Sequence, residues 1–173
     1  IQTSFLGVVL KNTSTLAAEF EIVNSTVSTV NENWKPVLGE QKEIQNNYNQ
    51  LVLELFQKSS KRKMNIVFRL FNEGLAFRYE FPAQVNLNYF VISDEVTQFA
   101  LVGDHIAFWI PGDYDSQEYV YNETKLSQVD VSKLDMNNGI GMKGPMANSR
   151  IQSPVMMKSI DGLYINIFEA AVV

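Results

Sequence analysis

A short acidic and aromatic segment contains the first candidate functional residues of this sequence. Residues 111–119 contain three carboxylates and two tyrosines, and they follow a tryptophan closely. Aromatic rings beside carboxylates suit sugar recognition, because a ring can cover the apolar face of a pyranose while oxygens accept hydrogen bonds from hydroxyl groups. The candidate substrate-binding residues are therefore Trp109, Asp113, Tyr114 and Asp115.

The same segment also has plainer interpretations. Asp113 and Asp115 give the Asp-x-Asp start of a calcium loop, but the glycine at the sixth position and the glutamate at the twelfth position of an EF-hand are absent. Carboxylates in such clusters commonly accept hydrogen bonds from nearby backbone N–H groups and so form turns. A structural role for the cluster therefore stays open.

A second candidate is the carboxylate near the end of the chain. Strand alternation in LYINIFE would put four side chains on one face, namely Leu163, Ile165, Ile167 and Glu169. Because the first three are apolar, Glu169 would end a core-facing row, where a carboxylate needs a paired charge or a cation. The alternative is that the core ends before Glu169, which then faces solvent or an arginine. Alternation alone leaves both interpretations open.

The counts of histidine and cysteine limit the remaining chemistry. The sequence has one histidine, His105, and no cysteine. Cysteine nucleophiles, thiolate zinc sites and zinc sites built from several imidazoles are thereby excluded. A bound metal ion would need oxygen ligands, which calcium and magnesium prefer. His105 lies in a predicted turn without a nucleophile elbow nearby, so we expect it to form structural hydrogen bonds.

Composition indicates one globular domain of 173 residues, with 46% hydrophobic and 19% charged residues. The formal net charge of −5 repels phosphate backbones, so no nucleic-acid partner is expected. No apolar run approaches the roughly 20 residues of a membrane helix, so no membrane span is expected. The first residues lack the pattern of a signal peptide, and an export signal would therefore lie outside this sequence.

Alternation with a period of two dominates the apolar pattern and predicts antiparallel strands. Residues 64–81 predict a hairpin around the loop at 72–74, with Gly74 available for positive φ. Further hairpins are predicted for 99–110 and for 155–168, where an Asp-Gly pair favours a type I′ turn with two positive φ angles. The polar residues 122–153 predict a long connection. The predicted fold class is an all-β antiparallel sandwich.

Four blocks of the sequence resemble the N-terminal domain of glycoside hydrolase family 97. They are ENWKPVLGE, FRLFNEGLAFRYEFP, FALVGDHIAFWIPGDYDSQEY and MMKSIDGLYINIFEAAVV. The resemblance covers about residues 6–173 and is weakest over 122–153. It implies an antiparallel β-super-sandwich similar to galactose mutarotase, truncated at both ends, with 1–173 as a single partial domain. The family includes α-glucosidases and α-galactosidases, and its catalytic (β/α)₈ barrel would follow this domain.

The resemblance also implies a role for Glu169. In the family, the glutamate of the block that matches INIFEAA ligates a calcium ion at the active site of the barrel. The other calcium ligands and the catalytic carboxylates lie on the barrel, so no catalytic residue is expected within 1–173 and this chain alone is predicted to be inactive. The expected partners are the enzyme's own barrel and an oligosaccharide containing α-linked glucosides or galactosides. The expected location is the periplasm or another exported compartment of a bacterium.

Other functional classes compete with this interpretation. The main alternative is a non-catalytic carbohydrate-binding β-sandwich module, and a purely structural domain is another. A mutarotase-like epimerase is disfavoured because those enzymes rely on paired histidines, whereas this sequence has only His105. The sequence that follows residue 173 would separate the hydrolase from the module, since a barrel predicts alternating strands and helices.

Overall fold

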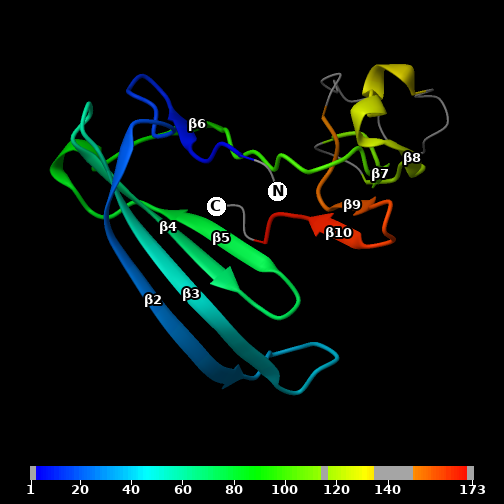
Figure 1. Ribbon diagram of the computed structural model, residues 1–173, viewed down its shortest axis with the longest axis horizontal. Helices are drawn as coiled ribbons and strands as arrows, with labels where there is room; N and C mark the ends of the chain where they lie inside the picture. Colours follow the sequence, from blue (N-terminus) through cyan, green and yellow to red (C-terminus); the bar gives the residue numbers. More distant parts are fainter. Residues whose placement is uncertain (1–2, 114–116, 135–149, 171–173) are drawn as a thin grey trace. The chain divides into compact units, whose positions relative to one another are not determined.

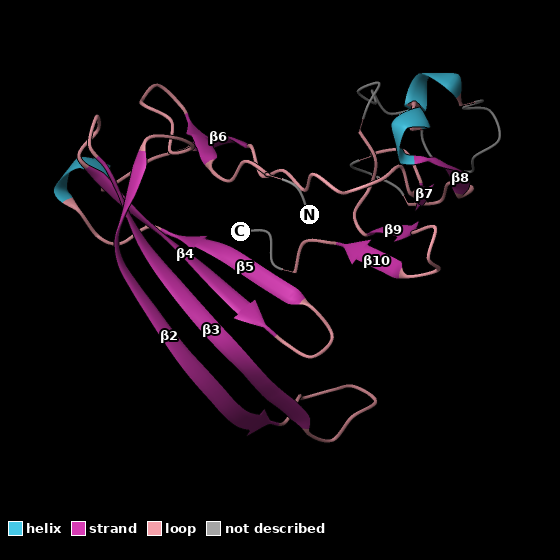
Figure 2. Ribbon diagram, in the orientation of Figure 1, coloured by secondary structure: helices cyan, strands magenta, loops and turns pink. Residues whose placement is uncertain are grey.

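The computed structural model describes residues 3–113, 117–134 and 150–170 (Figure 1). Two compact units are distinguished, Thr3–Ala100 and a second unit that contains Leu101–Val173. In the described residues, regular structure consists of ten β-strands and three short 3-10 helices (Figure 2). All strand pairs are antiparallel, so the predicted all-β fold class is confirmed. None of the helices in the described ranges is long and apolar enough to cross a bilayer.

The unit of residues 3–100 is organised around one four-stranded sheet. Its strands occur in the spatial order β2 (Phe20–Trp34), β3 (Ile44–Gln57), β4 (Arg62–Leu70) and β5 (Leu75–Glu80). A two-stranded sheet pairs β1 (Val8–Leu10) with β6 (Ile92–Glu95). Consecutive strands of the larger sheet are neighbours in space, as expected for an antiparallel meander.

Alternation decides which face of the larger sheet is buried. Leu55, Met64 and Ile66 share one face and pack with Leu10 and Leu16 in the core of this unit. The odd-numbered aromatic residues of β5 and the residue after it also pack against this core, namely Phe77, Tyr79 and Phe81. The face predicted for residues 75–81 is therefore confirmed for the aromatic side chains, whereas Leu75 at the start of the strand is exposed.

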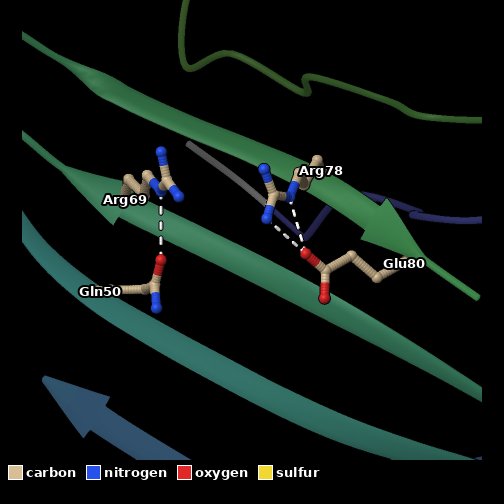
Figure 3. Close-up of polar contacts among 4 residues, drawn as sticks. All are labelled: Gln50, Arg69, Arg78 and Glu80. Carbon is tan, nitrogen blue, oxygen red and sulfur yellow. Dashed lines mark hydrogen bonds and ion pairs between the residues drawn. The ribbon is translucent and has the colours of Figure 1, made fainter. Parts of the chain in front are cut away.

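The opposite face of the sheet carries polar side chains, four of which are drawn in Figure 3. Arg69 Nε donates to Gln50 Oε1 at 3.1 Å, and Arg78 Nε donates to Glu80 Oε1 at 2.8 Å. The Arg69 guanidinium also lies 4.6 Å from the centroid of the Tyr48 ring. The long stems of such side chains cover apolar surface while their charges stay in water. Val67 lies on this face and is only 3% exposed.

The hairpin predicted at residues 64–81 is confirmed by β4 and β5, which pair from Asn65–Glu80 to Leu70–Leu75. Phe71 N–H donates to the carbonyl oxygen of Gly74 at 2.8 Å and closes the loop. Gly74 itself does not have positive φ, in contrast to Gly7, Gly39, Gly103 and Gly162. The loop therefore does not require the positive φ angle that glycine can adopt.

The unit of residues 101–173 contains the second four-stranded sheet. Its strands occur in the order β10 (Tyr164–Ile167), β9 (Val155–Lys158), β7 (Ile106–Trp109) and β8 (Asn122–Lys125). Ala107, Trp109, Val131 and Met157 form its buried core. Two 3-10 helices follow β8 in this unit, η2 (Leu126–Gln128) and η3 (Val131–Lys133), while η1 (Val85–Leu87) belongs to the other unit.

The hairpin predicted for residues 99–110 is wrong. Residues 99–102 form no strand, and β7 pairs with β8 and β9 instead. The side chain of Asp104 accepts hydrogen bonds from the backbone N–H and the hydroxyl of Ser127, at 2.9 and 2.8 Å. These bonds tie the turn before β7 to the segment after β8. A strand from the predicted polar connection thus takes the place beside β7.

The hairpin predicted for residues 155–168 is confirmed by β9 and β10, but its turn differs from the prediction. Ser159 N–H donates to Leu163 O at 2.9 Å, and Gly162 N–H donates back to Ser159 O at 3.0 Å. Only Gly162, at φ +81, has positive φ in this loop. The connection is therefore a longer loop than a two-residue type I′ turn.

The assignment of 1–173 to a single partial domain stays a prediction.

Replacing Gly7 with alanine tests the close packing beside β1. Gly7 has φ +148, and a Cβ atom there would lie 2.4 Å from Ala17 Cα, a backbone atom that cannot rotate away. We expect Gly7→Ala to lower the free energy of unfolding by about 2 kcal/mol or more in chemical denaturation.

Gly74→Ala provides the matched control, because a Cβ atom at Gly74 would meet nothing within 4 Å. This variant should change the free energy of unfolding by less than about 1 kcal/mol. Equal effects of the two substitutions would contradict the described packing at Gly7.

Candidate functional site

The segment after β7 is held by a short antiparallel contact with residues 150–152. Pro111 forms a bridge with Ile151, and Gly112 N–H donates to Arg150 O at 2.8 Å. On the other side, Gln152 N–H donates to Ile110 O at 3.0 Å. Two segments far apart in sequence thereby fix the backbone that leads into the acidic cluster.

Asp113 and Tyr119 form the part of the predicted acidic cluster that the structure brings together. The Tyr119 hydroxyl donates a hydrogen bond to Asp113 Oδ2. This hydrogen bond, with lesser contributions from desolvation and from the charge of Asp113, raises the pKa of Tyr119 to about 12. The Gln152 side-chain amide also donates to the Asp113 carbonyl at 3.2 Å. Asp113 thus lies in a small network of polar contacts.

The other residues predicted around this cluster have different outcomes. Tyr114 and Asp115 lie outside the described residues, so their predicted role in substrate binding stays a prediction. Tyr119 was not among the predicted site residues, although its ring and its segment were noted. Its contact with Asp113 joins two residues that are six apart in the sequence, and no fixed spacing rule for helices or strands predicts such a pair.

Trp109 lies in the core of its unit. It is 2% exposed, and its indole N–H donates to the Thr124 hydroxyl at 3.0 Å. A ring needs an open face to stack on a sugar, so this burial argues against the substrate-binding role predicted for Trp109. The side chain instead links β7 to β8 through its hydrogen bond and packs in one core cluster with Met157.

Glu169 lies two residues beyond the end of β10, and its side chain is exposed. Its backbone N–H donates to Ser153 Oγ at 3.2 Å, which holds this part of the chain. Ile165 and Ile167 pack against the core as alternation predicts, but Leu163 is 67% exposed. The apolar row is therefore shorter than predicted, and Glu169 follows it outside the core.

Glu169 could supply only part of the ligand set of a calcium ion. An exposed carboxylate supplies one or two hard oxygen ligands, whereas calcium takes six to eight. Within the described ranges, no group of three or more His, Cys, Asp or Glu side chains is arranged to hold a metal ion. A calcium site at Glu169 would need further ligands from elsewhere, and the metal-binding role stays a prediction.

The turn that contains His105 is held mainly through its backbone and through Asp104. The carbonyl oxygen of His105 accepts a hydrogen bond from Leu126 N–H at 2.8 Å. Hydrogen bonds from the Ser127 backbone and hydroxyl lower the pKa of the neighbouring Asp104 carboxyl. These contacts serve to dock the turn on η2, and they involve no arrangement of a nucleophile and a base.

Comparison with known proteins gives a match over the whole chain. Residues 1–173 match the family model described as Glycosyl-hydrolase 97 N-terminal. Among solved structures, a glycoside hydrolase family 97 enzyme from Pseudoalteromonas sp. strain K8 in complex with panose is 28% identical, with a TM-score of 0.82. The match covers 100% of this chain and 24% of that one. The chain thus spans about a quarter of the length of that structure.

Two further structures extend the comparison. A family 97 enzyme from the same strain in complex with acarbose is 27% identical, with a TM-score of 0.80, and the match covers 98% of this chain and 23% of that one. A β-arabinopyranosidase is 15% identical with a TM-score of 0.67, covering 90% of this chain and 24% of its own. At that identity the last likeness concerns the fold alone.

The contact between Tyr119 and Asp113 predicts a specific loss of stability at high pH. Because the folded pKa of Tyr119 is about 12 and the ordinary value is 10.0, the unfolded chain loses this proton first as the pH rises. The contribution of the contact is thus fully present below pH 10 and is lost between about pH 10 and 12. We expect stability to fall more steeply over this range in the wild type than in Tyr119→Phe, measured by denaturant midpoints.

Tyr121→Phe serves as the control, since it removes a hydroxyl from a ring that is 63% exposed in the same segment. Its stability profile should follow that of the wild type. Parallel profiles for the wild type and Tyr119→Phe would show that the hydrogen bond to Asp113 is not formed.

Proposed function

The chain belongs to the glycosyl-hydrolase 97 N-terminal family, and on this premise we propose that it is the non-catalytic β domain of a calcium-dependent glycoside hydrolase. The match of all 173 residues to the family model is the observation that carries this proposal. The TM-score of 0.82 to a family 97 enzyme supports it, because a shared fold over the whole chain goes beyond local similarity of motifs. The domain would pack on a catalytic (β/α)₈ barrel in the complete enzyme.

The proposed substrates are oligosaccharides with α-linked glucosides or galactosides. Similar structures are complexes with panose and with acarbose, which supports an oligosaccharide as the ligand of the intact enzyme. In glycoside hydrolysis, one carboxylic acid protonates the glycosidic oxygen, and a second carboxylate activates water or attacks the anomeric carbon. Both groups would lie outside residues 1–173, so this chain would shape and support the site without performing the proton transfers.

Glu169 is the residue that we propose to contribute directly to the active site, as a calcium ligand. Its carboxylate is exposed beyond the end of β10, so a second polypeptide segment can approach it. The hydrogen bond from its backbone N–H to Ser153 Oγ limits the motion of the backbone that carries it. Calcium bound there would orient sugar oxygens and stabilise developing negative charge.

The proposed location is the periplasm or another exported compartment. A domain without cysteine is compatible with an oxidising compartment, because it has no thiols that could form incorrect disulfides.

Replacing Glu169 with glutamine in the intact enzyme tests the ligand role. The substitution keeps the size of the side chain but removes its negative charge, so we expect calcium affinity to fall roughly tenfold or more. Activity should fall at limiting calcium and recover in part when calcium is raised. Calorimetric titration with calcium and the dependence of hydrolysis on calcium concentration would measure both effects.

Glu73→Gln is the matched control for this experiment, because Glu73 is exposed in the loop between β4 and β5. It should leave calcium affinity unchanged. If Glu169→Gln also retains wild-type calcium affinity, the assignment of Glu169 to the metal site is excluded.

Residues 1–173 produced alone should hydrolyse no aryl α-glycoside, because the proposed acid and base lie on the barrel. Circular dichroism of the purified chain should show β-structure, so that inactivity cannot be attributed to an unfolded sample. Measurable turnover by the purified chain, proportional to its concentration, would refute the proposal that the catalytic acid and base lie on the barrel.

A further inference from the structure

A pocket of about 420 Å³ lies within the unit of residues 3–100. Its walls come from the turn after β1, from the first residue of β4 and from η1 with the residues that follow it. The residues that matter for its chemistry are Lys11, Asn12, Thr13, Arg62, Asn88 and Tyr89. The volume is within the range of sites for small organic ligands.

Hydrogen bonds hold the walls of this pocket in place. The Asn86 side-chain amide donates to Ser60 O at 3.1 Å and to Lys61 O at 2.8 Å, which ties η1 to the loop before β4. Lys11 N–H donates to Val91 O at 2.8 Å, so the turn after β1 is tied to the segment that follows the pocket. Leu87 is buried in the core beneath. The pocket is thus preformed, which reduces the entropy lost when a ligand binds.

The pocket is positively charged, although the chain as a whole carries −5. Lys11 and Arg62 line it, and none of the lining residues is acidic. The Arg62 guanidinium donates to Asn86 O, Ser14 O and Thr13 Oγ1, which are all neutral oxygens. Neither cation takes part in the ion pairs found among the described residues. Two cations in a lining that contains no acidic residue favour an anion in this pocket.

The remaining lining groups indicate that the anion is carried by a sugar. Tyr89 lines the pocket and is 87% exposed as a residue, so its ring is open to contact with the apolar C–H face of a pyranose. The amides of Asn12 and Asn88 can both donate to and accept from sugar hydroxyls. A bare inorganic anion would leave most of the pocket and the aromatic ring unused.

We propose that this pocket binds a small anionic saccharide, a sugar that carries a carboxylate or a sulfate ester. Lys11 and Arg62 bind the anionic group, Asn12 and Asn88 bind hydroxyls, and Tyr89 packs on the ring. This proposal does not depend on the proposed hydrolase function. It gives this domain a binding activity for charged sugars.

Titration of the intact protein with D-glucuronate and with D-glucose 6-sulfate tests the proposal, with binding followed by calorimetry. D-glucose and inorganic sulfate serve as the uncharged and the sugar-free comparison. At least one charged sugar should bind at least about tenfold more tightly than either comparison, and its affinity should fall as salt is added. The stronger of the two charged sugars identifies the anionic group. Binding of sulfate as tight as that of both charged sugars, or absence of charged-sugar binding, would overturn the proposal.

Three variants assign the binding to this pocket. Lys11→Gln and Tyr89→Ala should each weaken binding of the preferred charged sugar about tenfold, because one removes a charge-assisted contact and the other a ring contact. Lys63→Gln is the matched control. Lys63 directly follows Arg62 in the sequence and is exposed, but it does not line the pocket. It should retain wild-type affinity. Wild-type affinity in Lys11→Gln, or equal losses in Lys11→Gln and Lys63→Gln, would refute the assignment.

Discussion

The pleat of the β2–β5 sheet fixes which of its side chains are buried in the larger unit. Successive side chains must point to opposite faces, so burying Leu55, Met64 and Ile66 on one face forces their neighbours onto the other. That second face accommodates Arg69 and Arg78 because their charged ends reach polar partners and water (Figure 3). The sheet is thus stabilised on one side by apolar burial and covered on the other by long polar side chains.

In the unit of residues 101–173, one buried aromatic side chain has the corresponding role. Trp109 packs in the core and donates its indole N–H to Thr124, so β8 is held beside β7 through a side chain as well as through the backbone. The burial that makes Trp109 useful for stability removes its ring from the surface. A polar contact of this segment lies farther along the chain, between Asp113 and Tyr119.

The groups proposed to bind ligands lie at strand ends and in loops. Glu169 follows β10, and the pocket with Lys11 and Arg62 is formed by turns and by the start of β4. The strands fix the backbone at these points, while side chains beyond the core can remain charged without the free-energy cost of burial. Both proposed sites use this arrangement, but their proposed ligands carry opposite charges, a cation at Glu169 and an anion at the pocket.

The local structure of this chain could be predicted from its amino-acid pattern. Alternation of apolar residues predicted the β4–β5 and β9–β10 hairpins and the buried face of β5, because both strands of a hairpin lie within one short stretch of chain. Tertiary structure alone decided the partners of β7, since the bonds between Asp104 and Ser127 join segments 23 residues apart. The packing of distant segments also buries Trp109, leaves Leu163 exposed and places Lys11 and Arg62 in the lining of one pocket. Alternation specifies the face of a side chain, whereas its neighbours depend on how distant segments pack.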